Sequence, residues 1–266
     1  MCARESGAGS GQSRRASDAE RLRLAPLYAI LDIDCLTQRL PAWRNAQQAP
    51  ASGGLDAEAE LLSAVLNFAR QLHEGGVRWL QYRAKQLPTR SALSHANALR
   101  QSFPELTLIM NDRADLCLAA EFDGVHVGQD DLSPEAVRRL VGSRIVGLST
   151  HSPEQLAEAS AGPADYVAIG PVFDTASKLN TSPVVGLEGV RRARQLTAKP
   201  LVAIGGITLA NCGEVRAAGA DRGKSRVCTS LAMSSSDCMR SFSLATTSRF
   251  SSRAVIRLNE VPRSAS

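Results

Sequence analysis

Four short polar patches lie at the points where apolar, strand-like runs of this chain end. The patches are QYRAK at residues 81–85, NDR at 111–113, GQDD at 128–131 and TASK at 175–178. Together they supply carboxylates, cations, amides and hydroxyls, which are the groups that hold a magnesium-bound diphosphate. The patches therefore predict an enzyme that uses a diphosphate substrate.

The patches must be held by a repeating framework, and the hydrophobic pattern predicts one. Apolar or β-branched runs alternate with amphipathic segments at intervals of about 20 to 30 residues, as in repeated βα units. Strands are expected at residues 27–33, 77–83, 107–111, 124–128, 145–150, 166–171 and 201–206. Helices are expected at residues 60–74, 90–101, 113–120, 134–141, 153–161, 187–196 and 211–218. The Ser-Pro pairs at 133–134 and 152–153 each indicate a helix N-cap followed by a first-turn proline.

The expected fold class is α/β, with a (β/α)8 TIM barrel as its architecture. The strands are mostly apolar throughout, which suits a parallel sheet covered by helices. With 266 residues and 44% hydrophobic content, the chain is large enough for one barrel core. A doubly wound open sheet is the structural alternative. Residues 38–56, rich in Gln, Pro, Ala and Gly, are expected to form a loop insertion.

The eighth βα unit is expected to be missing or garbled after Asp221. Residues 222–266 contain twelve serines, little periodicity and few acids, a composition typical of a disordered or out-of-frame segment. A reading-frame slip or a degenerate terminus is the favoured explanation, and a genuine basic interaction tail is the alternative. The expected domains are a disordered extension at 1–25, a barrel at 26–221 and the basic Ser/Arg-rich tail at 222–266.

The net charge of +5 comes from the tail. Residues 222–266 hold eight basic and two acidic residues, so the tail is +6, while the rest, with 23 basic and 24 acidic residues, is −1. Apart from Phe242 and Phe250, the tail lacks the aromatic side chains on which bases stack, so no nucleic-acid partner is expected.

Other functional classes find no support in the sequence. The six cysteines show no Cys-x-x-Cys spacing, which argues against a zinc or redox site. The first residues lack the apolar core of a signal peptide, and no apolar run approaches the ~20 residues that span a bilayer. The chain is therefore expected to be cytoplasmic, without a membrane partner. The sequence contains no nucleophile elbow and no phosphate-binding P-loop, so covalent hydrolase chemistry is not expected.

The spacing of the charged residues predicts where they point. Side chains alternate along a strand, so Gln81, Arg83 and Lys85 share one direction, which at the carboxyl end of a barrel strand is the mouth. Asp112 and Asp131 follow neighbouring strands about 4.8 Å apart, so both carboxylates can reach one Mg²⁺. The alternatives are a solvated loop for the cations, a helix cap for Asp112 and an ordinary loop position for Asp131.

Residues farther along the chain predict a second phosphate site. The hydroxyls and the ammonium group of residues 175–178 can hold phosphate oxygens, and Gly205-Gly206 permits close approach of the backbone. An ordinary polar loop is the alternative for residues 175–178. His126 lies inside a strand and is expected to be a packed, hydrogen-bonded core residue, whereas the role of His151 is left open.

The ordered series QYRAK, NDRAD, DGVHVGQDD, GLS, ADYVAIGP and AIGGI resembles the thiamine-phosphate synthases, which share their barrel with the thiazole tautomerases. The resemblance covers about residues 26–221. It implies a transferase that joins hydroxymethylpyrimidine diphosphate to a thiazole phosphate and releases diphosphate, in the biosynthesis of thiamine diphosphate. The carbon–oxygen bond ionises first, and the thiazole nitrogen then captures the pyrimidine-stabilised cation. The partners implied are these small molecules, and the oligomeric state stays open.

The resemblance also implies roles for individual residues. Asp112 and Asp131 would hold Mg²⁺, and Arg83, Lys85 and Lys178 would be the catalytic cations. The implied substrate-binding residues are Gln81, Tyr82, Arg83, Ala84, Lys85, Asn111, Ser149, Thr175, Ala176, Ser177, Lys178 and Gly206. Of these, Gln81, Arg83, Lys85, Asn111, Ser149 and Lys178 would hold the pyrimidine diphosphate, and Thr175, Ser177 and Gly206 would hold the thiazole phosphate.

The chain departs from the family pattern in two small ways and one large one. Ala84 stands where the family usually has Glu, and Ser177 where it has Thr. The large departure is the tail, which replaces the family's eighth strand and its phosphate-binding loop. A thiazole tautomerase-like paralogue and an inactive truncated barrel are therefore kept as alternatives, although a tautomerase would not need all the diphosphate-binding residues together.

Overall fold

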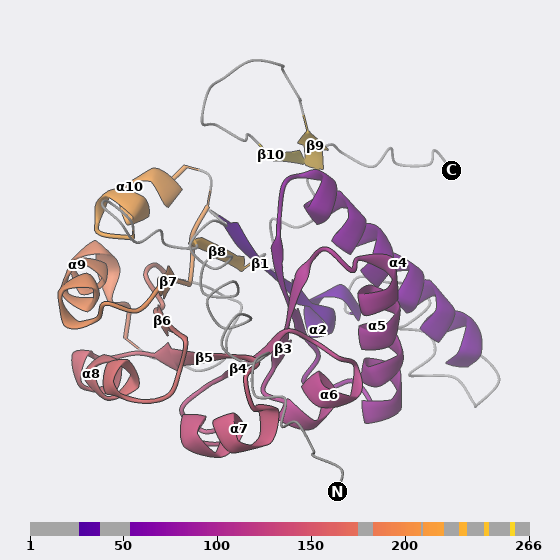
Figure 1. Cartoon of the computed structure of the whole chain (residues 1–266). Helices are drawn as coiled ribbons and strands as arrows, with labels where there is room; N and C mark the ends of the chain where they lie inside the picture. The colour runs from indigo at the N-terminus through magenta and orange to yellow at the C-terminus, as the bar shows by residue number, and fades with distance from the viewer. Residues whose placement is uncertain are drawn as a thin grey trace, which may run out of the picture.

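The computed structural model describes residues 27–37, 54–174, 183–208, 210–220, 229–232, 242–244 and 256–258. Eight parallel strands close into a barrel in the order of the sequence, and helices surround them (Figure 1). The strands are β1 (Leu27–Asp32), β2 (Trp79–Arg83), β3 (Thr107–Asn111), β4 (Gly124–Val127), β5 (Ile145–Thr150), β6 (Tyr166–Ile169), β7 (Leu201–Ala203) and β8 (Thr229–Ala232). The expected TIM-barrel architecture is confirmed, and the open doubly wound sheet is excluded.

Among the described residues, seven helices lie close to their expected places, and a short further helix that directly follows the first strand was not predicted. They are α2 (Ile33–Thr37), α4 (Gly54–Glu74), α5 (Thr89–Ser102), α6 (Ala114–Ala119), α7 (Pro134–Val141), α8 (Pro153–Ala161), α9 (Gly186–Leu196) and α10 (Cys212–Ala217). The Ser133 and Ser152 hydroxyls each accept a hydrogen bond of 3.3 Å from a first-turn backbone N–H, which confirms both N-caps. No described helix combines the length and apolarity that a membrane crossing requires.

Helix α4 begins earlier than expected, inside the segment that was predicted to be a loop. Ala57 is buried one turn before Leu61, and Val65 and Ala69 continue the same apolar face. This face extends the helix toward the N-terminus as far as Gly54. The loop prediction is therefore wrong for residues 54–56, and residues 38–53 lie outside the described part of the chain.

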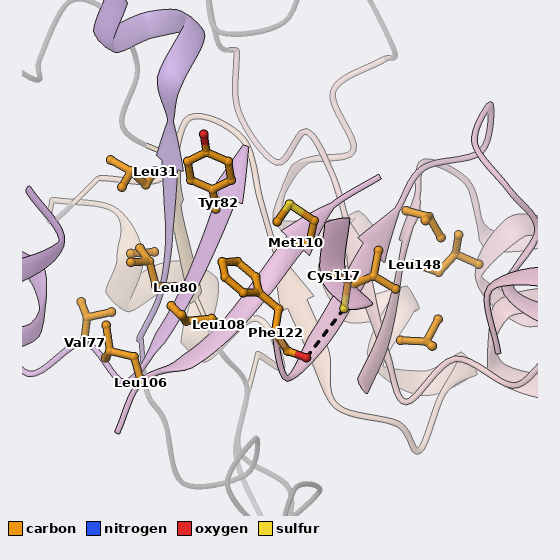
Figure 2. Packing of buried hydrophobic residues seen from close by; sticks show 14 of the residues in the cluster. Leu31, Val77, Leu80, Tyr82, Leu106, Leu108, Met110, Cys117, Phe122 and Leu148 are labelled. Atoms are coloured by element: carbon orange, nitrogen blue, oxygen red, sulfur yellow. Dashed lines mark hydrogen bonds between the residues drawn. The ribbon is translucent and has the colours of Figure 1, made fainter. Parts of the chain in front are cut away.

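Alternation along the strands produces two apolar layers. Seven residues, led by Tyr28, Trp79 and Tyr166, form a cluster inside the barrel. The opposite strand faces, including Leu80, Leu108 and Leu148, pack against the helices in a larger shell (Figure 2). Because Trp79 belongs to the inner cluster and Leu80 to the shell, Gln81 and Arg83 must follow Trp79 toward the barrel axis and its mouth.

A short strand, β8, takes the place of the eighth strand inside the segment that was predicted to be missing or garbled. Strand β8 pairs with β1 over four residues, from Leu27↔Thr229 to Ile30↔Ala232, and meets β7 at Ala203↔Thr229. Without this strand, β1 and β7 would be the edges of an open sheet with unpaired backbone groups, and β8 closes the barrel between them. Its polar residues resemble the tail composition, which explains why the sequence pattern did not reveal it.

Two more short strands are described within the segment that was predicted to be a basic, disordered or frame-shifted tail. Within residues 222–266, besides β8, the segments β9 (Phe242–Leu244) and β10 (Ile256–Leu258) pair as an antiparallel two-stranded sheet. Each is an apolar-polar-apolar triplet, a pattern typical of a short strand. The remaining tail residues and the extension at 1–25 lie outside the described residues.

Candidate active site

Arg83, at the end of β2, is held by two carboxylates of the first unit. Its Nη1 lies 2.5 Å from Asp32 Oδ2 and 3.7 Å from Asp34 Oδ2. Asp34 also accepts hydrogen bonds of 3.1 Å from the backbone N–H groups of Lys85 and Gln86. The ion pairs fix the Arg83 guanidinium at the mouth of the barrel, and the hydrogen bonds to Asp34 fix the start of the loop that follows β2.

A second set of charged residues connects the ends of β2, β3 and β4. Lys85 Nζ lies 2.8 Å from Asp112 Oδ2, and Asp131 Oδ2 accepts a 2.7 Å hydrogen bond from the Gly128 backbone N–H. Burial raises the pKa of the Asp131 carboxyl above its usual range, and the neighbouring Asp112 carboxyl raises it further. The Gly128 N–H and the Lys85 charge oppose this increase. Two carboxylates from adjacent units are thus close enough for one to raise the pKa of the other.

The Asp112 and Asp131 carboxylates suit a divalent cation that also binds the oxygens of a diphosphate. Asp112 has a φ of 60°, the left-handed region that a non-glycine residue adopts at a cost, as found at many functional sites. In this conformation its backbone N–H donates to the His126 carbonyl over 2.8 Å. The described residues contain no cluster of three or more His, Cys, Asp or Glu side chains, so substrate oxygens or water would complete the coordination of Mg²⁺.

A buried chain of polar side chains crosses the inside of the barrel below the charged groups. Gln81 Nε2 donates to Tyr28 Oη over 2.8 Å, and Tyr28 Oη lies 2.9 Å from Tyr166 Oη. Tyr166 Oη lies 2.8 Å from His126 Nδ1, and His126 Nε2 lies 2.8 Å from Ser149 Oγ. The expectation that His126 is packed and hydrogen-bonded is confirmed.

Glycines shape the side of the mouth at β6 and β7. A side chain on Gly206, whose φ is 62°, would meet the Asp174 carbonyl oxygen at 2.6 Å, so only glycine fits. The Phe173 backbone N–H donates to the Gly205 carbonyl over 3.1 Å. These contacts bring Gly206 beside Asp174. The next residues, Thr175, Ala176, Ser177 and Lys178, lie outside the described part of the chain.

Other predicted residues differ in where their side chains lie. Asn111 is half-buried at the end of β3. Tyr82 and Ala84 face the outer shell, and the Tyr82 hydroxyl contacts His95 Nδ1 at 3.1 Å, so only their backbone groups can reach the mouth. His151 Nδ1 contacts the Gly170 carbonyl at 2.5 Å, which places it between the ends of β5 and β6.

Four further polar side chains of the site were not predicted: the carboxylates of Asp32 and Asp34 and the inner hydroxyls of Tyr28 and Tyr166. Asp32 ends a strand just as Asn111 does, so the rule applied to the other patches would have found it. The tyrosines carry no such signal, because a strand tyrosine is usually a packing residue.

With this geometry established, comparison with known proteins identifies the family. A family model described as thiamine monophosphate synthase matches residues 55–223. The chain belongs to the thiamine monophosphate synthase family. The thiamine-phosphate synthase of Koribacter versatilis (strain Ellin345) is 51% identical over 205 residues, which cover 76% of this chain and 88% of that protein. The thiamine-phosphate synthase of Chloroflexus aurantiacus is 43% identical over 149 residues, covering 55% and 69% of the two chains.

A solved structure carries the same family assignment. The thiamine phosphate pyrophosphorylase from Pyrococcus furiosus matches with a TM-score of 0.60 and 29% sequence identity, covering 80% of this chain and 87% of that one. The resemblance noted from the ordered motifs is therefore confirmed for the thiamine monophosphate synthase family and for its barrel.

Proposed function

We propose that this chain is a thiamine-phosphate synthase, which couples hydroxymethylpyrimidine diphosphate to a thiazole phosphate and releases diphosphate. The observation that carries the proposal is the ion pair of Lys85 with Asp112, next to Asp131 and Arg83, at one mouth of the barrel. Family membership and the named relatives support the same reaction. The catalytic unit is residues 26–221 together with strand β8.

Magnesium is the cofactor that this site fits. Asp112 and Asp131 would hold it, and when bound it would neutralise charge on the departing diphosphate. Lys85 and Arg83 are the cations that remain for the diphosphate oxygens. Both are paired with carboxylates of the protein, so they are already oriented before the substrate arrives.

The residues of this chain act mainly on charge and position. The carbon–oxygen bond of the pyrimidine substrate breaks with both electrons leaving on the diphosphate, so its negative charge grows in the transition state. Arg83 and Lys85 stabilise that charge, with Lys178 as a third cation by resemblance. Gln81, Ser149 and Asn111 would bind and orient the pyrimidine part. No protein nucleophile is required, because the thiazole nitrogen captures the carbon.

The second substrate would bind beside the β6 and β7 ends. Gly206 lies where only glycine fits, next to Asp174, and the adjoining Thr175, Ala176 and Ser177 would supply backbone and hydroxyl donors to the thiazole phosphate. The barrel closure by β8 favours an active enzyme over an inactive truncated barrel, because it removes the open edge that motivated that alternative.

The experiment is a diphosphate-release assay with the purified full chain, Mg²⁺ and both substrates. We expect release from the natural sequence and a loss of at least roughly 10²-fold in Asp112→Ala. Asp115→Ala is the matched control, because Asp115 is an exposed aspartate three residues away that pairs with Arg113, and its loss should leave release unchanged. Folded, stable protein that releases no diphosphate under these conditions would contradict the proposal.

A further inference from the structure

The buried chain from Gln81 to Ser149 connects two candidate substrate contacts through residues with no role in the reaction so far. Its five members come from β2, β1, β6, β4 and β5, and all are buried. Its four links measure 2.8, 2.9, 2.8 and 2.8 Å. Such a continuous network is costly to bury unless its members are satisfied, and it is rigid when they are.

Packing fixes the middle of this chain. The Tyr166 ring stacks on the His126 ring with centroids 5.4 Å apart and an interplanar angle of 27°. It also meets the Trp79 ring edge to face at 6.1 Å. A side chain on Gly147 would come within 2.1 Å of the Tyr166 ring, so β5 has no room for anything larger than glycine there. Tyr166 is therefore held by ring contacts as well as by its hydroxyl.

We propose that Tyr28, Tyr166 and His126 are positioning residues that orient the Gln81 amide and the Ser149 hydroxyl toward the pyrimidine substrate. The inference rests on the proposed function for those two end residues. It deepens that function by naming the residues that orient the Gln81 and Ser149 side chains, since each of these side chains is hydrogen-bonded to a residue of another strand. The three residues act through Gln81 and Ser149 and do not touch the reacting atoms.

The hydrogens can be assigned so that each tyrosine hydroxyl donates to the next member of this hydrogen-bonded series. Gln81 Nε2 can only donate, so Tyr28 accepts from it and donates to Tyr166, which in turn donates to His126 Nδ1. His126 then carries its hydrogen on Nε2 and donates to Ser149 Oγ. The hydroxyl hydrogen of Ser149 stays available to the ligand, and the Oε1 of Gln81 is turned away from Tyr28.

The shell provides a matched control for this inner chain. His95 and Tyr82 form a second buried tyrosine–histidine contact at 3.1 Å, between β2 and α5. His126→Leu and His95→Leu therefore make the same substitution in the same kind of contact at two places. Tyr166→Phe removes only the hydroxyl, and Tyr28→Phe serves if His126→Leu does not fold.

The test measures Michaelis constants for each substrate and calorimetric binding of the pyrimidine diphosphate, with melting temperatures alongside. We expect Tyr166→Phe and His126→Leu to weaken pyrimidine binding at least about fivefold, the size of one lost hydrogen bond, with the thiazole constant within about twofold. His95→Leu should lower the melting temperature without changing either constant.

A double mutant distinguishes a positioning role of Tyr166 from general destabilisation of the fold. Because Tyr166 acts through Ser149 and Gln81, Tyr166→Phe should cost clearly less when Ser149→Ala is already present. The proposal is overturned if the cost is the same in both backgrounds, if Tyr166→Phe leaves pyrimidine binding intact, or if His95→Leu has the same effect. If the natural protein binds pyrimidine diphosphate but forms no product, only the proposed reaction is contradicted. The positioning role can still be tested, because it rests on pyrimidine binding by the natural protein and the variants.

Discussion

The inside of the barrel and its outer shell each bury a tyrosine–histidine contact, but in different surroundings. Inside, Tyr166 and His126 continue on both sides to Tyr28 and Ser149 and so reach the mouth. In the shell, His95 contacts Tyr82, and its Nε2 has no hydrogen-bond partner among the described residues. The inner contact belongs to a network that leads to the site, and the outer one ends in apolar packing.

The difference shows how this barrel separates stability from chemistry. Shell residues such as Leu108 and Phe122 are buried between strands and helices, where burial stabilises the fold without approaching the mouth (Figure 2). Inner residues lie on the opposite strand face, which runs directly to Arg83 and the carboxylates. Substitutions on the two faces should therefore have separable effects on the free energy of unfolding and on activity.

The largest expected effect is a loss of stability in the shell. Leu108→Ala removes a fully buried side chain and should lower the free energy of unfolding by about 2–5 kcal/mol. Denaturant unfolding measures this loss, and diphosphate release by the remaining folded protein at low temperature should be unchanged. A large fall in the activity of the folded fraction would contradict the claim that the outer strand face affects stability and not activity.

The next effect concerns activity at the mouth. Asp131→Asn keeps an oxygen that can accept from the Gly128 N–H but removes a charge beside Asp112, so activity should fall by roughly 10²-fold or more. The melting temperature should stay the same or rise slightly, because the like-charge contact is relieved. Initial rates across Mg²⁺ concentrations measure the first outcome, and a drop in melting temperature would contradict the second.

A pH experiment isolates the shell histidine. Burial lowers the pKa of His95 to about 4, although the charge of Glu58 opposes this shift. The unfolded chain, with a histidine pKa near 6.5, binds the proton first, so stability falls as the pH is lowered from about 6.5 toward 4, by about 2 kcal/mol at pH 5. His95→Gln should abolish this part of the loss. Parallel acid-dependent unfolding curves for the two proteins would refute the assignment.

The smallest expected effect comes from the partner of Arg83. Asp32→Asn removes the charge that holds the guanidinium at 2.5 Å, so the catalytic efficiency with pyrimidine diphosphate should fall roughly tenfold, or about 1.4 kcal/mol. Higher ionic strength should not restore it, since the fault is orientation. Glu188→Gln, which alters an exposed contact with Arg191 on α9, is the control expected to have no effect.

Much of the fold could be predicted because its signals are local. Seven of the described helices and the first seven barrel strands followed from the hydrophobic period, whereas the short helix α2 was not predicted. The Ser133 and Ser152 caps followed from residue type and spacing. The early start of α4 was missed because Ala57 is a weak hydrophobic signal. Strand β8 was missed because four residues of mixed polarity become a strand only when the edge of β1 is there to pair with them.

The candidate site divides in the same way. The sequence by itself determined that Arg83, Lys85, Asp112 and Asp131 stand at strand ends, because alternation and strand length fix which residues reach the mouth. Only the tertiary structure decided that Asp112 lies close enough to Asp131 to raise its pKa, and that Tyr28 meets Tyr166, 138 residues along the chain. Such contacts depend on closure of the barrel and on the stagger of its strands, which no local pattern of side chains encodes.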